Sequence, residues 1–308
     1  MNASAPAKVI LFGEHAVVYG QPALAVPVSQ LRVTASVTHT PGEGLKIIAA
    51  DINQTLPVTI DNTVVDNALT RMAQITLDFL QATPPEVAIS FRSDIPPASG
   101  LGSGAAVSAA LGRAVALAVG SAISESDLNR LVYEVERIHH GTPSGLDNTV
   151  IVYERPVYFI REITLETLVI GQPFMLLIAD TGKTALTKHA VGDVRSLYET
   201  QTETTRPVIE AIGEIARAAR VALEHGDTIR MGQLASENHT LLQQLTVSSP
   251  ELDQLVDAAC EAGALGAKLS GGGRGGNMIA FVTEATVLSV RSALETAGAV
   301  RVIQTIVQ

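Results

Sequence analysis

The chain has little of what several classes of protein require. Its 308 residues include a single cysteine, Cys260, so a disulfide framework and a zinc site built from cysteines are both excluded. Basic residues number 21 against 31 acidic ones, and the net charge is −10. This balance argues against nucleic acid as the main partner, because binding to a phosphate backbone needs a basic face. Together these absences favour a globular protein from a reducing compartment.

The sequence also lacks a run of residues typical of a membrane span. The longest stretch without a charged residue, 95–112, contains two prolines and four glycines, which is typical of a loop that leads into a helix. A single basic residue, Lys8, precedes the first short apolar stretch, which is too little for a secretory signal. We therefore expect a soluble, cytoplasmic protein with neither membrane nor nucleic acid as a partner.

Apolar patterning predicts strands and helices in separate blocks. Hydrophobic residues make up 46% of the chain, enough for the core of one large domain or of two ordinary ones. Short apolar or alternating runs predict strands over 9–12, 23–28, 32–37, 87–91, 157–161, 174–179, 278–282 and 300–307. Longer amphipathic or wholly apolar runs predict helices over 105–119, 125–140, 202–225, 229–245, 250–263 and 284–297. Because the blocks do not strictly alternate, we predict an α+β fold with a boundary near residues 165–172.

A glycine-rich segment before a wholly apolar helix, residues 95–106, predicts an anion site. Small residues at a helix N-terminus expose backbone N–H groups and the positive end of the helix dipole. A plain turn between a strand and a helix is the alternative. The segment also matches a dinucleotide fingerprint, but so does 271–276, and the two prolines before the first glycine do not suit a dinucleotide fold. The Walker pattern and the nucleophile elbow of serine hydrolases are both absent.

Two acidic residues on either side of a tight turn form a second chemical pattern. Glu136 lies near the end of a predicted helix, where a carboxylate is unfavourable for the helix dipole. The chain then turns through Gly-Thr-Pro-Ser-Gly and presents Asp147. Two carboxylates brought together in this way suit a metal ligand and a base, and solvated surface acids are the alternative. His139 and His140 are interpreted as structural, because adjacent helical positions point about 100° apart.

Glycines and lysines are concentrated in two further segments. Residues 271–276 hold five glycines, a density needed only where backbone approaches something closely or adopts positive φ. Near the N-terminus, Lys8, Glu14 and His15 surround one predicted strand and its turn. A lysine placed in such a segment is more suggestive than usual, since arginine supplies most other positive charge. Of the five lysines, Lys8 lies in the N-terminal segment and Lys268 lies beside the glycine-rich one.

Four motifs together resemble the kinase superfamily named for galactokinase, homoserine kinase, mevalonate kinase and phosphomevalonate kinase, the GHMP kinases. They are Lys-Val-Ile-Leu-Phe-Gly-Glu-His-Ala-Val-Val-Tyr-Gly at 8–20, Gly-Leu-Gly-Ser at 100–103, His-Gly-Thr-Pro-Ser-Gly-Leu-Asp-Asn at 140–148 and Lys-Leu-Ser-Gly-Gly-Gly at 268–273. They match in order and approximate spacing, so the resemblance covers nearly the whole chain. The first and third motifs resemble the mevalonate kinase branch in particular.

The resemblance implies a two-domain α+β fold with the active site in the cleft between the domains. The N-terminal domain, like ribosomal protein S5, would span 1–168, and a ferredoxin-like C-terminal domain would span 169–308. The implied activity is transfer of the γ-phosphoryl group of ATP to an alcohol with Mg²⁺. The mevalonate kinase branch implies mevalonate as the alcohol, a step of isoprenoid biosynthesis. Phosphomevalonate or a sugar is the alternative substrate, a sugar-binding or regulatory protein without activity is the alternative class, and a homodimer is left open.

The resemblance also implies roles for individual residues. Asp147 resembles the catalytic aspartate, and Lys8 the lysine that pairs with it. Glu136 and Ser103 resemble Mg²⁺ ligands. Residues at the substrate would be Glu14, His15 and Thr187. The implied ATP-binding residues are Pro97, Ala98, Ser99, Gly100, Leu101, Gly102, Ser103, Gly104, Ala105, Ala106, Gly272 and Gly273.

Arg161 is a candidate for the mevalonate carboxylate on separate grounds. It ends the predicted strand 157–161, in which Val157, Phe159 and Arg161 share one face by alternation. An arginine that follows two apolar residues on an inward face needs an anionic partner, and bidentate pairing suits a carboxylate. A surface pair with Glu162 or Glu166 is the alternative.

The chain departs from the family pattern at three places. Gly104 stands where the family usually has the second serine of the phosphate loop. The third loop usually reads Ala-Gly-Gly-Gly-Gly-Cys, whereas here Arg274 interrupts the glycines and Asn277 follows them. A pair of glycines usually follows the catalytic aspartate, and Glu154 and Arg155 replace it. None of these changes removes a predicted catalytic group.

Overall fold

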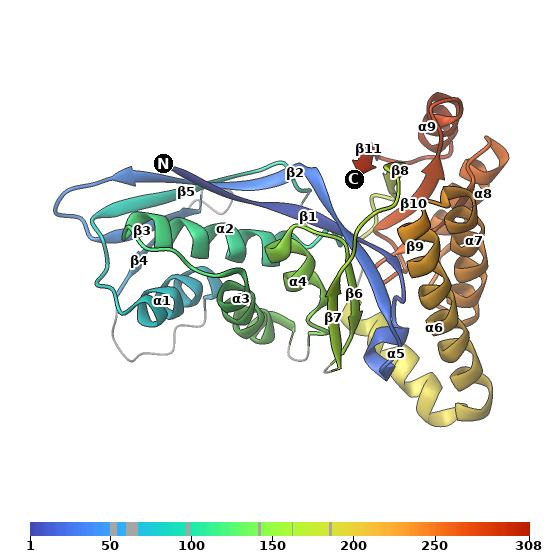
Figure 1. The fold of residues 1–308 in the computed structure, drawn as a ribbon, viewed down its shortest axis with the longest axis horizontal. Coiled ribbons are helices and arrows are strands. Elements are labelled where there is room, and N and C mark those ends of the chain that lie inside the picture. Colours follow the sequence, from blue (N-terminus) through green and yellow to red (C-terminus); the bar gives the residue numbers. More distant parts are fainter. Residues whose placement is uncertain (50–53, 60–66, 97–98, 141–142, 162, 185–186) are drawn as a thin grey trace. The chain divides into compact units, whose positions relative to one another are not determined.

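The chain forms two compact units, each a mixture of helices and strands (Figure 1). The computed structural model describes residues 1–49, 54–59, 67–96, 99–140, 143–161, 163–184 and 187–308. Unit 1 comprises residues 1–7, 29–96 and 102–154, and unit 2 comprises 8–28, 97–101 and 155–308. The predicted α+β class is confirmed. The predicted domain division after residue 168 stays a prediction.

Unit 1 is built on strands covered by helices on one face (Figure 1). Residues 33–39 of β2 pair antiparallel with β5, β5 pairs parallel with β3, and β3 pairs antiparallel with β4. Strands β1 and β2 pair with each other and both continue into unit 2. The strands are β1 (Asn2–Phe12), β2 (Ala23–His39), β3 (Leu45–Ala49), β4 (Gln54–Val58) and β5 (Val87–Ser93). The helices are α1 (Ala68–Leu80), α2 (Ser103–Ala118), α3 (Glu125–His140) and α4 (Leu146–Tyr153).

Close packing of α2 against α1 and α3 makes the core of unit 1. The residues of α2 are mostly small and apolar on all of its sides, and most of its length is buried, as expected for such a helix. A Cβ atom on Gly112 would lie 2.6 Å from the Cε atom of Met72 in α1 and 2.7 Å from Cδ1 of Leu128 in α3. Glycine at position 112 therefore permits the close approach of α2 to α1 and to the first turn of α3.

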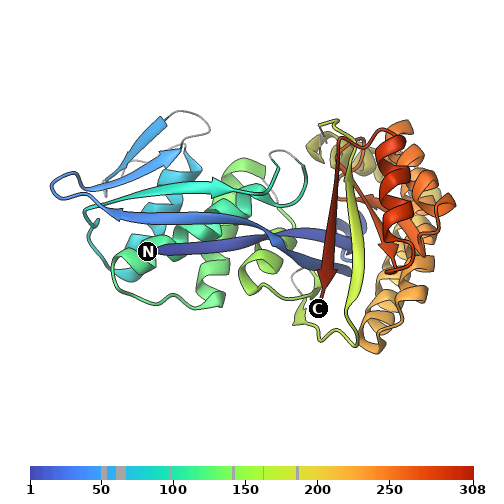
Figure 2. The ribbon, with the colours of Figure 1, turned by 90° about the horizontal axis from the view of Figure 1, so that it is seen from above.

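Unit 2 contains a four-stranded antiparallel sheet in the order β11-β8-β10-β9. With the helices between its strands, the chain follows the β-α-β-β-α-β pattern of ferredoxin-like domains, as predicted. The helices lie on one face of this sheet (Figure 2). The strands are β8 (Phe174–Asp180), β9 (Gly266–Ser270), β10 (Asn277–Val282) and β11 (Arg301–Val307). The helices are α5 (Thr187–Thr200), α6 (Thr202–His225), α7 (Thr228–Gln244), α8 (Pro250–Glu261) and α9 (Val287–Thr296).

Apolar side chains between this sheet and the helices form the core of unit 2. Leu177 of β8 and Met278 of β10 are fully buried in one cluster with Ile212 of α6, Leu242 of α7 and Leu252 of α8. The unit also holds a short ladder in which residues 23–25 of β2 pair with β6 (Val157–Ile160), and β6 pairs with β7 (Thr164–Thr167). A 3₁₀ helix, η1 (Ala16–Tyr19), follows β1.

The structure corrects three predicted strand boundaries. The predicted strand 9–12 is the end of β1, which begins at Asn2. The predicted strands 23–28 and 32–37 form the single strand β2, because the exposed polar residues Ser29 and Gln30 between them keep an extended backbone. The predicted strand 157–161 ends at Ile160, which pairs with Thr164 and leaves Arg161 in the turn. Several elements carried no sequence prediction: α1, α4, α5, β3, β4, β7 and β9.

None of the helices in the described ranges is both long enough and apolar enough to cross a membrane.

Candidate active site

The turn after β1 directs two predicted substrate residues into the interior of unit 2. Gly13 has φ 91°, and a Cβ atom there would lie 2.3 Å from the carbonyl oxygen of Pro22, so the turn requires glycine. His15 also has a positive φ, 60°, at the start of η1. The side chains of Glu14 and His15 are both buried as a result.

Glu14 forms a buried ion pair with Lys268 of β9. Lys268 also donates to the carbonyl oxygen of Leu269 at 2.6 Å, and Asn238 Nδ2 of α7 lies 3.5 Å from Glu14 Oε2. Burial lowers the pKa of Lys268, and the negative charge of Glu14 opposes this shift. Each charge is therefore held in the interior by the other, because either one alone would be strongly unfavourable there.

Sequence reasoning did not assign Lys268 or Asn238 to the site. The scarcity of lysine singled out Lys268, but its pairing with a residue 254 positions away needed the fold. Asn238 is fully buried in an amphipathic helix, and a polar residue on the apolar face was the one available signal. Its Oδ1 atom is buried without a hydrogen-bond partner among the described residues.

One ring nitrogen of His15 can accept a hydrogen bond from a substrate. Its Nε2 atom lies 3.0 Å from the carbonyl oxygen of Gly272, so Nε2 carries the proton and donates it. Burial, with smaller contributions from the charges of Arg274 and Lys268, lowers the pKa of His15 to about 4, so the ring is neutral at pH 7. Its Nδ1 atom is buried and has no partner among the described residues. A hydroxyl group at this point would find an acceptor.

Within unit 2, the first part of the predicted phosphate loop is tied to β1 and to the third glycine loop. The backbone N–H of Lys8 donates to the carbonyl oxygen of Leu101 at 3.0 Å. Asn277 Nδ2 donates to the carbonyl oxygen of Ser99, so the departure from the usual cysteine supplies a contact to the loop. The side chain of Ser270 donates to the carbonyl oxygen of Ile10 at 2.8 Å. The predicted ATP-binding residues Pro97 and Ala98 lie outside the described residues.

The third glycine loop needs its glycines for close approach. Gly273 has φ 76°, and a Cβ atom there would lie 1.9 Å from the carbonyl oxygen of Val247. Arg274, which departs from the family pattern, has φ 56° and forms an ion pair with Asp193 of α5. Its Nε atom donates to the carbonyl oxygen of Thr246 at 3.2 Å. The charge of Arg274 is therefore bound within unit 2.

In unit 1, the remaining part of the predicted phosphate loop opens α2. Gly102 has φ 77° and is followed by Ser103 and the exposed Gly104, after which Ala105 and Ala106 are buried. The N-cap residue of this helix is Gly102, which has no side chain to cap it. The first backbone N–H groups of α2 and the positive end of its dipole suit a phosphate group.

The carboxylate of Glu136 lies against the first turn of α2. Glu136 is buried near the end of α3, and its Oε1 atom is 3.4 Å from the position that a Cβ atom on Gly104 would take. The place of the serine that the family usually has is therefore beside this carboxylate, one residue from Ser103. Within the part of the chain that the structure describes, no three acidic, histidine or cysteine side chains cluster as a metal site. Mg²⁺ needs no such cluster, since one or two carboxylates and substrate phosphates commonly hold it.

Asp147 lies in the first turn of a helix, α4, that the sequence did not predict. The helix begins after Gly145, which has φ 89°. Its N-terminal end is held to α3, because Asn148 Nδ2 donates to Asn129 Oδ1 at 2.6 Å. Asp147 itself is half-buried. A carboxylate in the first helical turn suits the helix dipole, whereas Glu136 near a helix end does not.

The other predicted substrate residues lie in unit 2. Thr187 begins α5, and its side chain is not among those described. Arg161 is half-buried in the turn after β6. Glu166, one of the two surface partners considered for Arg161, is bound by Arg220 at 2.5 Å, and Glu162 lies outside the described residues. The roles of Arg161 and Thr187 stay predictions.

Two family models match the chain. Residues 65–155 match the GHMP kinases N terminal domain, and residues 219–300 match the GHMP kinases C terminal domain. A mevalonate kinase from Pyrococcus horikoshii is 35% identical over 98% of this chain and 94% of that protein. The chain belongs to the GHMP kinases, as its motifs predict. Its curated relatives within that family include mevalonate kinases, among them one from Saccharolobus solfataricus at 30% identity over 94% of this chain and 92% of that protein.

Solved structures show the same likeness. The crystal structure of L. major mevalonate kinase in complex with R-mevalonate has a TM-score of 0.85 and is 28% identical, covering 100% of this chain and 96% of that one. The Methanococcus jannaschii mevalonate kinase has a TM-score of 0.88 at 25% identity, covering 100% of this chain and 98% of that one. A Lactococcus lactis galactokinase has a TM-score of 0.79 at 20% identity, covering 100% of this chain and 92% of that one, a likeness that shows the fold alone.

Proposed function

We propose that this chain transfers the γ-phosphoryl group of ATP to the 5-hydroxyl group of (R)-mevalonate, giving 5-phosphomevalonate. The observation that carries the proposal is the 35% identity to the P. horikoshii mevalonate kinase, which spans 98% of this chain. Both units, and therefore all four motifs, are included in that similarity. Phosphoryl transfer requires mainly positioning and charge neutralisation from the protein, and the site residues offer both.

Phosphate binding is assigned to the start of α2 and the loop before it. The N-terminus of α2 supplies backbone N–H groups and partial positive charge to the phosphates of ATP. The third glycine loop, with Gly272 and Gly273, is assigned to ATP as well.

The residues of unit 1 fit a magnesium ion. Glu136 places a hard carboxylate oxygen beside the first turn of α2, and the hydroxyl group of Ser103 lies on the same turn. We assign Mg²⁺ to Glu136 and Ser103, with ATP phosphates as further ligands. When bound, the ion neutralises negative charge on the phosphates during transfer.

Asp147 and Lys8 are assigned to the transfer step. Asp147 accepts or orients the proton of the 5-hydroxyl group while the oxygen of that hydroxyl group attacks the γ-phosphorus. The positive charge of Lys8 stabilises negative charge on the group in transfer. The Asp147 carboxylate lies in the first turn of α4, at the positive end of a helix dipole.

Mevalonate recognition is assigned to unit 2. Neutral His15 offers its buried Nδ1 atom as an acceptor for a hydroxyl group of mevalonate, and Glu14 lies next to it in the chain. Arg161 is assigned to the mevalonate carboxylate, because a guanidinium group and a carboxylate form a bidentate, charge-assisted pair. The side chain of Thr187 is assigned to the same substrate.

The proposal is tested by ADP release from purified protein with Mg-ATP and a panel of alcohols: mevalonate, phosphomevalonate, galactose and homoserine. We expect turnover that depends on mevalonate and little with the other three. Turnover with phosphomevalonate or a sugar but not with mevalonate would replace the proposed substrate. Absence of turnover with every alcohol would favour a binding protein on the same fold.

A further inference from the structure

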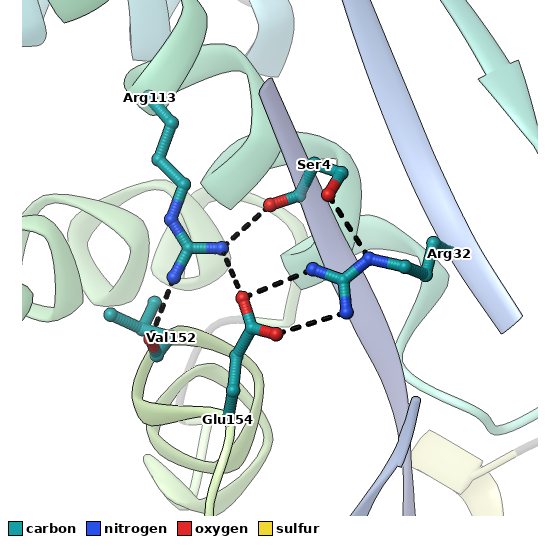
Figure 3. Close-up of polar contacts among 5 residues, drawn as sticks. All are labelled: Ser4, Arg32, Arg113, Val152 and Glu154. Atoms are coloured by element: carbon teal, nitrogen blue, oxygen red, sulfur yellow. Dashed lines mark hydrogen bonds and ion pairs between the residues drawn. The ribbon is translucent and has the colours of Figure 1, made fainter. Parts of the chain in front are cut away.

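One carboxylate in unit 1 binds two arginines from different elements (Figure 3). Glu154 Oε1 lies 2.7 Å from Nη1 of Arg113 in α2 and 3.1 Å from Nη2 of Arg32 in β2. Its Oε2 atom lies 2.9 Å from Arg32 Nη1, so Arg32 binds the carboxylate in a bidentate manner. Both arginines also bind Ser4 of β1: Arg32 Nε donates to its hydroxyl oxygen at 3.0 Å, and Arg113 Nη1 to its carbonyl oxygen at 2.6 Å.

The same network closes the C-terminal end of α4. Arg113 Nη2 donates to the carbonyl oxygen of Val152 at 2.8 Å, one of the last carbonyls of that helix, which have no partner within it. Glu154 follows the last helical residue and has a left-handed conformation, φ 50° and ψ 35°. That conformation favours glycine, which explains the glycines usual in the family at this point. Here Glu154 adopts this strained conformation, and its carboxylate binds the two arginines.

The helix held in this way carries Asp147. Glu154 lies seven positions, about two helical turns, after Asp147. The N-terminal end of α4 is bound to α3 through Asn148 and Asn129. The C-terminal end is bound to α2 and β2 through Glu154, and the two arginines that bind Glu154 also bind Ser4 of β1. Because α2 begins at Ser103, the helix of the proposed base and the helix of the proposed phosphate site are joined by Arg113.

We propose that Glu154, acting with Arg113 and Arg32, is a positioning residue that fixes α4, and hence the Asp147 carboxylate, relative to the start of α2. The proposal rests on the function proposed above. Glu154 does not touch the reacting atoms in this account. It acts by preventing α4 from tilting, and a displacement of about 1 Å at a reacting group is enough to slow a transfer step strongly.

Partial exposure makes this role separable from stability. The side chains of Glu154, Arg32 and Arg113 are 32%, 29% and 23% exposed, so water screens their charges and loss of the network leaves no charge in a dry interior. Replacement of Glu154 by glycine also relieves the left-handed strain, which offsets part of the lost ion pairing. The variant Glu154→Gly should therefore fold while lacking the restraint.

The test compares the steady-state kinetics of the variants Glu154→Gly, Glu154→Gln and Arg113→Met with those of the wild type. Rates are expressed per folded molecule, and the concentration of folded protein is measured by titration with a nucleotide analogue. We expect kcat to fall by about 10-fold in Glu154→Gly and Arg113→Met and by less in Glu154→Gln, with KM for ATP and for the alcohol within about twofold. The double variant Glu154→Gly/Arg113→Met should be no slower than either single one, because both changes remove the same restraint.

Gln81→Gly is the matched control. Gln81 is exposed, lies in unit 1 and ends α1 in the same left-handed conformation, φ 52°, so its replacement relieves strain without touching the network. It should leave kcat unchanged. Unchanged kcat with a lowered melting temperature in the Glu154 and Arg113 variants would overturn the positioning role. If the wild type phosphorylates another alcohol instead of mevalonate, only the proposed substrate is wrong. The same comparison of variants is then made with that alcohol.

Discussion

One ion-paired group in unit 2 and one in unit 1 are held in opposite ways. In unit 2, Glu14 and Lys268 are 1% and 0% exposed and neutralise each other in the interior. In unit 1, Glu154 binds its two arginines with all three side chains partly exposed. A buried pair is costly to break, whereas a partly exposed network is removed at a smaller cost in stability. We therefore expect the Glu14–Lys268 pair to act first on folding, and the Glu154 network on the rate of the reaction.

The largest expected effect follows from breaking the buried pair. Lys268→Met should lower the free energy of unfolding by about 3–5 kcal/mol, because it leaves the Glu14 carboxylate buried without its partner. Urea denaturation measures the loss of free energy. The double variant Lys268→Met/Glu14→Gln should recover much of this free energy, because no unpaired charge is left in the interior. Equal stability of the single and double variants would show that an unpaired Glu14 carboxylate is not the cause of the loss.

Removal of the proposed base should have the next largest effect, on rate rather than stability. Asp147→Asn should reduce kcat by roughly 10²-fold or more, the scale expected for a lost general base, while ATP binding changes little. Asp127→Asn, in the first turn of α3, is the matched control and should keep wild-type kcat. A near-normal kcat in Asp147→Asn would reassign Asp147 to structure.

Substrate recognition by unit 2 is expected to depend on Arg161. Arg161→Met should raise KM for mevalonate by roughly 10-fold, which corresponds to a charge-assisted pair worth ~1.5–3 kcal/mol. KM for ATP should stay within about twofold, because binding of one substrate alone is weakened. The exposed Arg155, changed to Met, is the control. If Arg161→Met keeps the wild-type KM for mevalonate, another group holds the carboxylate.

Acid should destabilise unit 2 through His15. Burial lowers its pKa from the usual 6.5 to about 4 in the folded chain, so the unfolded chain binds the proton first as pH falls. Stability contributed by neutral His15 is complete above pH 6.5 and is lost between 6.5 and about 4, by up to ~1.4 kcal/mol per pH unit. His15→Gln should flatten this slope in denaturation curves, and an unchanged slope would mean that His15 is accessible to protons in the folded state. Burial lowers the pKa of His239 as well, so part of the slope should remain.

The smallest effect is expected at the metal. Glu136→Gln should raise the Mg²⁺ concentration needed for half-maximal rate, since a neutral amide is a weaker ligand than a carboxylate. Ser103→Ala should raise it less, because a hydroxyl group contributes no charge. An unchanged Mg²⁺ titration in Glu136→Gln would remove this residue from the metal site.

The sequence predicted long elements better than the short ones that carry the site. Helices such as α3 and α6 were predicted at their observed bounds, because an amphipathic period repeats over several turns. The eight residues of α4 are apolar on most sides and follow a glycine turn, so no period was visible. Motifs identified Asp147, Glu136 and Glu14, whereas Lys268 and Asn238, the partners of Glu14, lie 254 and 224 positions away in the chain. Such pairs depend on tertiary packing, which local patterns do not contain.

The central claim, phosphoryl transfer to the primary hydroxyl of mevalonate, is tested most directly by ³¹P NMR of the product formed from Mg-ATP and (R)-mevalonate. We expect a phosphomonoester signal split by the two protons of the neighbouring CH₂ group, formed in step with ADP. A singlet would place the phosphate on the tertiary 3-hydroxyl, and ADP formed with inorganic phosphate alone would reflect hydrolysis. Either result would contradict phosphoryl transfer to the primary hydroxyl group.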